Sequence, residues 1–477
     1  MKSILLTSLL IANIFSTYFI GGISTYGISM VDVVSVIIIF YSMYRLIWKG
    51  EPFYVPPFPF LSRITALTIA VICSVAVPLL SSNAEMQVQW IKTFLHYFYV
   101  VVIAFAIIGS NFSVKDIHFS YKIFISFSLF VSTFGIYQLF ARAFDLPFAW
   151  ITMTTDANMG RGIEFEEWGQ LSLQFGSFFR ATSFFSEPSG LAGYTMQILT
   201  LLLVPVSMKN GSFLSSRLII WILTFVNLAA LLLAFSLTGL VIALTTIVFY
   251  IFYERKISFS GILKFIFFVP IIAFMTDRFV ALYTDVSVID LFTQRIGGIY
   301  SVLFGGTVQT TGGESFFGRL DTMLRAIDVW MHYPITGFGL GCTYLYDKVN
   351  QLTFIDSTFF TVLAETGILG MITFLALFGS FFVFLMNRMH HVMQHNTLSQ
   401  EAKQLLSVVP YVFMSQVIIL FTTSFFVAFW IYQTFGIIVS VLIAVHNEIG
   451  LSSQQIFLVN EPLRNRFLNG IQRLRIS

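Results

Sequence analysis

The chain has 477 residues, of which 57% are hydrophobic and only 10% are charged, and its net charge at pH 7 is +3. A soluble globular domain carries about 25% charged residues, so this composition excludes a protein with a mainly water-facing surface. The small net charge gives no basis for expecting nucleic acid as a partner. The two cysteines, Cys73 in an apolar run and Cys342 in a loop, argue against a disulfide framework and against a structural zinc site.

Apolar runs long enough to cross a bilayer recur along most of the chain. A transmembrane helix needs roughly 20 predominantly apolar residues. The first run follows Met1-Lys2 as in a secretory signal, but no small-residue cleavage site comes after it, so we interpret it as a membrane helix. The runs predict twelve spans, near residues 3–20, 28–48, 62–80, 90–109, 122–142, 188–206, 217–234, 237–253, 260–275, 358–386, 405–423 and 426–446. The predicted fold is all-α, a polytopic transmembrane helical bundle that forms a single integral membrane domain over residues 1–477.

The distribution of positive charge predicts how this bundle is oriented. Most of the 26 lysines and arginines lie in every second connection, beginning with the N-terminus and ending with the basic tail at 447–477. Positive residues concentrate on the cytoplasmic side of a membrane, so both termini are predicted to be cytoplasmic. We expect the tail to lie against anionic lipid headgroups.

Two segments are too long and too polar to be spans or simple connections: residues 143–187 and 276–357. Both are predicted to lie on the extracytoplasmic side. Loops longer than about 15 residues in a compact protein are usually functional or disordered, and these two carry aromatic residues and arginines that run against the orientation bias. We therefore expect two folded loops with short amphipathic helices, and these loops hold the candidate functional residues.

The first candidate stretch runs from Arg180 to Ser189 and leads into the sixth predicted span. Pro188 suits the first turn of a helix, and Glu187 or Ser186 then lies near the positive N-terminal end of that helix. Two interpretations are open. Arg180 and Glu187 form a structural pair beside a capped helix, or Arg180 is a cation directed at an anionic headgroup at the membrane edge.

The second candidate stretch is predicted to be an amphipathic helix at the outer membrane interface, ended by Pro334. Arg319 and His332 lie among its polar residues. Arg325 has Asp321 four residues before it, an arrangement worth only about 0.3–0.5 kcal/mol when exposed. A purely structural pairing is therefore an alternative role for Arg325.

A GxGxG pattern follows this helix, formed by Gly337, Gly339 and Gly341. No predicted strand–turn–helix unit surrounds the pattern, which argues against a nucleotide-binding loop. Glycine lets other groups approach the backbone closely. We therefore predict a tight substrate loop that includes Gly337 and Gly339, with His332 on the helix before it.

The third candidate stretch lies at the outer mouth of the tenth predicted span. Asp356 either caps that helix or supplies a reactive carboxylate, and both interpretations are open. Glu365 follows nine residues later, so the two carboxylates point to opposite sides of a helix and are not a catalytic pair. An acidic residue inside a span must face protein or a water-filled cavity, which makes Glu365 a secondary candidate.

Together these stretches resemble the bacterial O-antigen polymerase and O-antigen ligase superfamily of polytopic membrane glycosyltransferases. Its members carry an R-A-x-x-x-F-x-E-P-S segment, an arginine-led helix that ends in h-P-x-x-G-x-G-x-G, and a polar residue ahead of E-x-G-x-x-G. The matching residues here are 180–189, 319–341 and 356–370. The first five predicted spans are recognisable only by their hydropathy.

One departure separates the branches of this superfamily. O-antigen ligases typically place a His-Asn, His-Ser or His-Gln pair where this sequence has Asp356-Ser357. The departure favours a polymerase of surface polysaccharide, of O-antigen or capsule type, over a ligase that transfers glycan to a lipid A core or another acceptor. A transporter or flippase of lipid-linked glycans is the rival from another class, and the scarcity of ionisable residues deep in the spans argues against it.

The resemblance implies a reaction between polyprenyl-diphosphate-linked oligosaccharides at the outer face of the bacterial inner (cytoplasmic) membrane. The growing glycan would leave its polyprenyl diphosphate and pass, with inversion, to a sugar hydroxyl of the next lipid-linked repeat unit. We expect neither a metal ion nor another cofactor. The other candidate partners are membrane lipids, a chain-length regulator and a flippase.

The resemblance also suggests roles for the charged residues. Arg180 and Arg319, with Arg325 as a weaker third, are expected to bind the diphosphate, because guanidinium groups bind phosphate bidentately and keep their charge. Asp356 is the first candidate for a general base acting on the sugar hydroxyl, and Glu187 is the second.

Overall fold

The computed structural model describes most of the chain. The described residues are 1–23, 26–51, 58–81, 83–154, 167–168, 170, 174–175, 178–254, 314–346, 355, 357–393, 397–422 and 429–449, with scattered positions between 271 and 297. Asp356, most of the predicted ninth span, much of both long loops and the tail from residue 450 lie outside them.

The described part of the protein is mostly helical. Its α-helices are α1 (Lys2–Ile14), α2 (Met30–Ile47), α3 (Phe58–Cys73), α4 (Ala76–Leu80), α5 (Ala84–Gly109), α6 (Val114–Ala143), α7 (Pro188–Ser207), α8 (Arg217–Ala234), α9 (Leu237–Glu254), α12 (Glu314–His332), α13 (Thr358–Met393), α14 (Gln400–Thr422) and α15 (Phe429–Glu448). Nine helical segments of this described part, α3 and α4 together counting as one, are long and apolar enough to cross a membrane. The prediction of a multi-pass helical membrane protein is confirmed in this form, and the number of twelve crossings stays a prediction.

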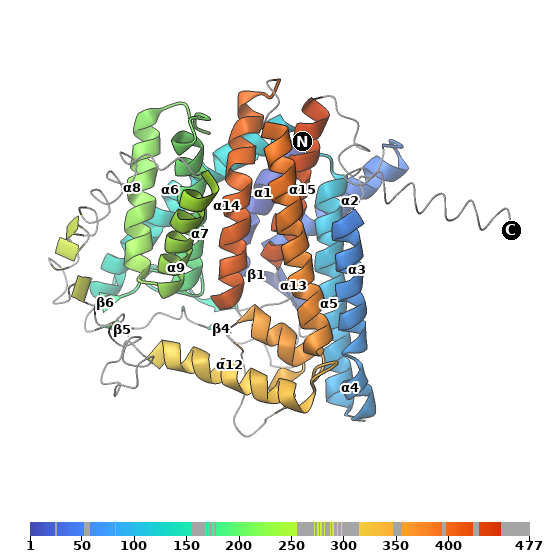
Figure 1. The fold of residues 1–477 in the computed structure, drawn as a ribbon. Coiled ribbons are helices and arrows are strands. Elements are labelled where there is room, and N and C mark those ends of the chain that lie inside the picture. Colours follow the sequence, from blue (N-terminus) through green and yellow to red (C-terminus); the bar gives the residue numbers. More distant parts are fainter. Residues whose placement is uncertain are drawn as a thin grey trace, which may run out of the picture.

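The long helices stand side by side, and α12 lies across one end of the bundle (Figure 1). We call this end the loop face. It also carries the residues 334–346 that follow α12 and two small hairpins, β3–β4 (Met153–Thr154 with Glu167–Trp168) and β5–β6 (Gln174–Phe175 with Phe178–Phe179). The N-terminus lies at the opposite end of the bundle (Figure 1). Which of the two ends faces the cytoplasm stays a prediction.

The helix α14 packs against α7 and α9 and also against α13 and α15. A phenylalanine cluster lies where α3, α13, α14 and α15 meet. The Phe381 ring lies 4.9 Å from that of Phe435 and 5.4 Å from that of Phe413, measured between ring centroids. Membrane helices associate largely through such close packing, because lipid supplies no hydrophobic driving force between them. The abundance of phenylalanine in the sequence is explained in part by this cluster.

The structure corrects the length of the first predicted span. α1 ends at Ile14, and β1 (Phe19–Ile23) and β2 (Tyr26–Ser29) then pair antiparallel. Glycine disfavours helix, and aromatic and β-branched residues favour strands. The hydroxyl of Tyr99 donates to the carbonyl oxygen of Asp32 at 3.3 Å. Tyr99 lies 15 residues into α5, so α2 begins about 20 Å from the loop-face end of α5.

Candidate functional site

The loop after α12 and a break in α13 bind each other at the loop face. The helix α13 is interrupted at Gly367, where φ is +66° and ψ is −165°. The loop supplies hydrogen-bond partners around this break. The amide of Phe338 donates to the carbonyl oxygen of Ala364 at 2.9 Å, and the amide of Ile368 donates to that of Pro334 at 2.9 Å. The two glycine motifs of the sequence are therefore the two halves of one junction.

Glycine is required in this junction for its backbone conformation and for its size. Gly337 and Gly367 have φ values of +71° and +66°, in the left-handed region that side chains disfavour. A Cβ atom at Gly337 would clash with the backbone of Glu365, and one at Gly367 would clash with the carbonyl oxygen of Ile335. The close approach predicted at Gly337 is thus made by protein backbone, and contact with a substrate stays a prediction.

The other two glycines of the pattern fit the same loop against α4 and α5. A Cβ atom on Gly339 would overlap Pro78 of α4, and one on Gly341 would overlap Thr93 of α5. These contacts give a packing reason for one glycine at every second residue of the loop.

Glu365 lies inside this junction and faces protein. Its side chain is buried, and Oε1 accepts a hydrogen bond from the Thr343 hydroxyl at 3.0 Å. The neighbouring Cys342 is also buried. Burial, together with the nearby charge of Glu365, raises the pKa of the Cys342 thiol.

The Arg180–Ser189 segment folds tightly against α6. Arg180 comes directly after β6, and only 9% of its surface is exposed. The hydroxyl of Ser183 donates to the carbonyl oxygen of Val131 at 2.6 Å. Glu187 is the N-cap residue of α7 but makes no side-chain capping hydrogen bond. Its carboxylate accepts a hydrogen bond from the Ser189 hydroxyl at 2.9 Å. These contacts hold the segment in an ordered turn just before α7.

A residue that the sequence analysis did not single out organises this segment. Arg142, in the last turn of α6, donates to the carbonyl oxygen of Arg180, to Gln170 Oε1 at 2.7 Å and to Thr182 Oγ1 at 2.7 Å. Its guanidinium also lies 4.2 Å from the ring centroid of Trp150. The sequence did hold a clue to Arg142. It lies at the predicted outer end of a span, where positive residues are disfavoured.

The helix α12 carries predicted site residues at both of its ends. The structure describes the backbone at Arg319 but not its side chain. His332 lies 13 residues further along the helix, or about 20 Å away, so Arg319 and His332 do not share one diphosphate-sized site. Between them, Arg325 Nε lies 2.9 Å from Asp321 Oδ2, and both side chains are partly exposed. The structural pairing considered for Arg325 is thus present.

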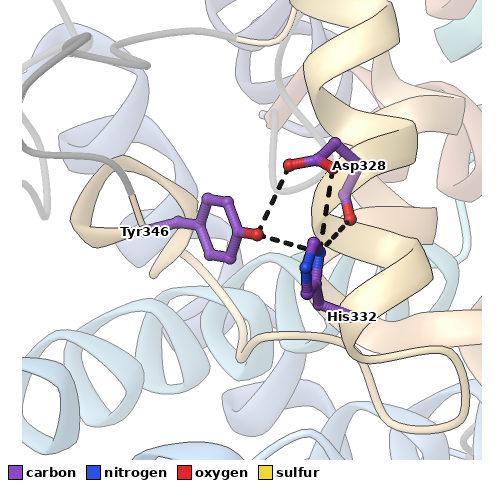
Figure 2. Close-up of polar contacts among 3 residues, drawn as sticks. All are labelled: Asp328, His332 and Tyr346. Carbon is purple, nitrogen blue, oxygen red and sulfur yellow. Dashed lines mark hydrogen bonds and ion pairs between the residues drawn. The ribbon is translucent and has the colours of Figure 1, made fainter.

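His332 belongs to a polar cluster with Asp328 and Tyr346, shown in Figure 2. Its Nδ1 lies 2.9 Å from the carbonyl oxygen of Asp328 and 3.0 Å from the hydroxyl of Tyr346. The hydroxyl of Tyr346 in turn donates to Asp328 Oδ2 at 3.4 Å. A neutral imidazole that donates from Nδ1 to the carbonyl has its acceptor nitrogen at Nε2. The cluster ties the turn at 343–346 to the last turn of α12.

Asp356 lies outside the described residues, and its role stays a prediction. Ile355 and Ser357 are buried, and α13 begins at Thr358. The helix α13 contacts α12. The described residues contain no group of three or more His, Cys, Asp or Glu side chains that could hold a metal ion.

Comparison with known proteins adds one similarity. No protein-family model matches the chain. Over 197 residues the chain is 29% identical to a curated O-antigen polymerase of Salmonella muenchen. The aligned region covers 40% of this chain, and it spans 44% of the length of the curated relative.

The structure brings together part of what the sequence predicted. The Arg180 segment, α12 and the loop around Gly337 all lie at the loop face (Figure 1). Two participants were not predicted: Arg142, which holds the Arg180 segment, and Tyr346, which holds His332. No spacing rule pairs Tyr346 with His332, because the contact crosses a loop.

Proposed function

We propose that the protein polymerises a surface polysaccharide of O-antigen or capsule type. It transfers the growing glycan from polyprenyl diphosphate to a sugar hydroxyl of the next lipid-linked repeat unit, at the outer face of the bacterial inner membrane. The observation that supports this most strongly is the gathering of the three motif segments at one end of a membrane bundle. The partial similarity to an O-antigen polymerase supports the same class of reaction.

The proposed chemistry uses side chains of the chain itself. A hydroxyl oxygen of the acceptor sugar forms a bond to the anomeric carbon of the donor, while the bond from that carbon to the diphosphate oxygen breaks. The hydroxyl proton passes to a carboxylate, with Asp356 as first candidate and Glu187 as second. The polyprenyl diphosphate leaves with the bonding electrons, and Arg180 and Arg319 stabilise the charge that builds on its oxygens.

The contacts of Arg325 give it a smaller part in this scheme. Its guanidinium is already paired with Asp321 on a partly exposed helix face. An exposed pair of this kind opens at little cost, so Arg325 contributes positive charge to the loop face. We keep it as an accessory cation for the diphosphate.

Reconstitution with purified lipid-linked repeat units tests the proposed function. The wild-type protein should form a ladder of long glycans, whereas a flippase would only move the substrate and a ligase would require a separate acceptor. Removing one well-placed donor to a developing anion typically lowers kcat about 10²–10³-fold, and we expect losses of this size for Arg180→Ala and Arg319→Ala. Loss of a general base typically costs about 10²–10⁴-fold, which is the loss we expect for Asp356→Ala. Arg319→Lys should also fail, because ammonium cannot bind a phosphate bidentately.

Arg217→Ala serves as the matched control. Arg217 is an exposed arginine at the start of α8, at the end of the bundle away from the loop face. Its loss should leave the glycan ladder unchanged. Normal chain lengths in all three loop-face alanine variants would refute the assignment of these residues.

A further inference from the structure

Arg142 is a buried arginine at the loop-face end of α6, with only 7% of its surface exposed. A buried guanidinium is costly unless its donors are paired. Here Nε donates to the carbonyl oxygen of Ala149 at 2.9 Å, and the two terminal nitrogens donate to the carbonyl oxygen of Arg180 and to the side chains of Gln170 and Thr182. These four hydrogen bonds engage most of the five N–H donors of the group.

The partners of Arg142 surround the backbone at Arg180. The carbonyl oxygen of Arg180 and the hydroxyl of Thr182 both accept hydrogen bonds from the same guanidinium, so the chain is held on either side of residue 181. Gln138, one turn earlier on α6, accepts from the Thr182 hydroxyl at 3.1 Å and donates to Gln170 Oε1 at 2.9 Å. The network closes on itself, and each member limits the movement of the others.

Gln170 extends the network to the start of α7. Its side-chain amide donates to the carbonyl oxygen of Ser183 at 2.6 Å and to that of Phe185 at 3.1 Å. On the other side, the guanidinium of Arg142 stacks on Trp150. Arg142 thus connects two parts of the first long loop with the end of a membrane helix.

We propose that Arg142 is the positioning residue for Arg180 in the polymerisation reaction. The proposal rests on the function proposed above, in which Arg180 binds the diphosphate of the donor lipid. With its donors engaged by protein, Arg142 does not itself hold the diphosphate. It sets the backbone from which the Arg180 side chain reaches the substrate, and a small displacement at such a site lowers binding and rate sharply.

The variant Arg142→Lys tests this assignment. Arg142→Lys keeps the charge but presents one ammonium in place of a planar fork, so it cannot reach all four acceptors. In the reconstituted reaction we expect the donor concentration that gives half-maximal rate to rise about tenfold. A purely structural defect would lower the amount of active enzyme and leave this concentration unchanged.

A double-mutant cycle shows whether Arg142 acts through Arg180. If it does, Arg142→Lys combined with Arg180→Ala should behave as Arg180→Ala alone, within about twofold, because effects of residues that act as a unit are not additive. If the loss in the double variant equalled the product of the two single-variant losses, the proposal would be overturned. If Arg142→Lys fails to accumulate in the membrane, Thr182→Val provides the same cycle with the loss of one hydroxyl.

Arg45→Lys is the matched control. Arg45 is also buried, and its guanidinium donates to the carbonyl oxygen of Gly109 at 2.8 Å, at the end of the bundle opposite the loop face. Its replacement should leave the donor dependence unchanged. The two proposals fail in different ways. Wild-type rates in Arg180→Ala would refute the role of Arg180 in the proposed function, whereas an impaired Arg180→Ala beside an unaffected Arg142→Lys would refute only the positioning role.

Discussion

Gly337→Ala tests whether the junction between the α12 loop and α13 holds the loop face together. An alanine at φ +71° costs about 1–2 kcal/mol relative to glycine. Its methyl group would also clash with the backbone of Glu365, and overpacking of this kind costs a further 1–3 kcal/mol or so. If the loop moves away, the hydrogen bond from the Phe338 amide to Ala364 weakens, which removes about 0.5–1.5 kcal/mol more. We therefore expect a loss of about 3 kcal/mol or more.

The thermal unfolding midpoint of the detergent-purified protein measures this loss, and we expect it to fall by several degrees. Gly379→Ala is the matched control, because Gly379 lies in α13, the helix on the other side of the junction, and a Cβ atom there would meet no heavy atom within 4 Å. Alanine is the better helix former by up to about 1 kcal/mol, so this variant should unfold at the wild-type temperature or slightly above. Equal midpoints for the two variants would refute the account of the junction.

Two further predictions concern the core and the buried thiol. Phe381→Ala removes a ring that pairs with four other phenylalanine rings and should cost about 3–5 kcal/mol. A midpoint close to that of the wild type would mean that the neighbouring rings fill the space. Burial raises the pKa of Cys342, so its thiol stays protonated at pH 8 and should react slowly with maleimide in the native protein. Unfolding in SDS should accelerate the labelling of Cys342, and mass spectrometry of the labelled peptide would show equal rates if the thiol were accessible.

Local sequence was sufficient to predict most of the bundle because the bilayer imposes a local rule. A chain in lipid must satisfy its backbone hydrogen bonds within each helix, so a run of apolar residues specifies a helix whatever its neighbours are. The predicted span at 188–206 corresponds in this way to α7 (Pro188–Ser207). The first span shows the limit of the rule. The segment after Ile14 is apolar enough for lipid, but β1 and β2 pair there in place of a longer helix.

The candidate site also depends partly on local sequence and partly on tertiary packing. The sequence by itself identified Arg180, Glu187 and the glycine pattern, since each belongs to a motif of fixed local spacing. Only the tertiary structure decided what these residues touch. Gly337 in the loop leaves room for the backbone of α13, and Gly367 in α13 leaves room for the backbone of the loop. Arg142 lies 38 residues before the carbonyl group it holds. Such contacts depend on which helices pack together, and shape complementarity between distant segments leaves no periodic signal in the chain.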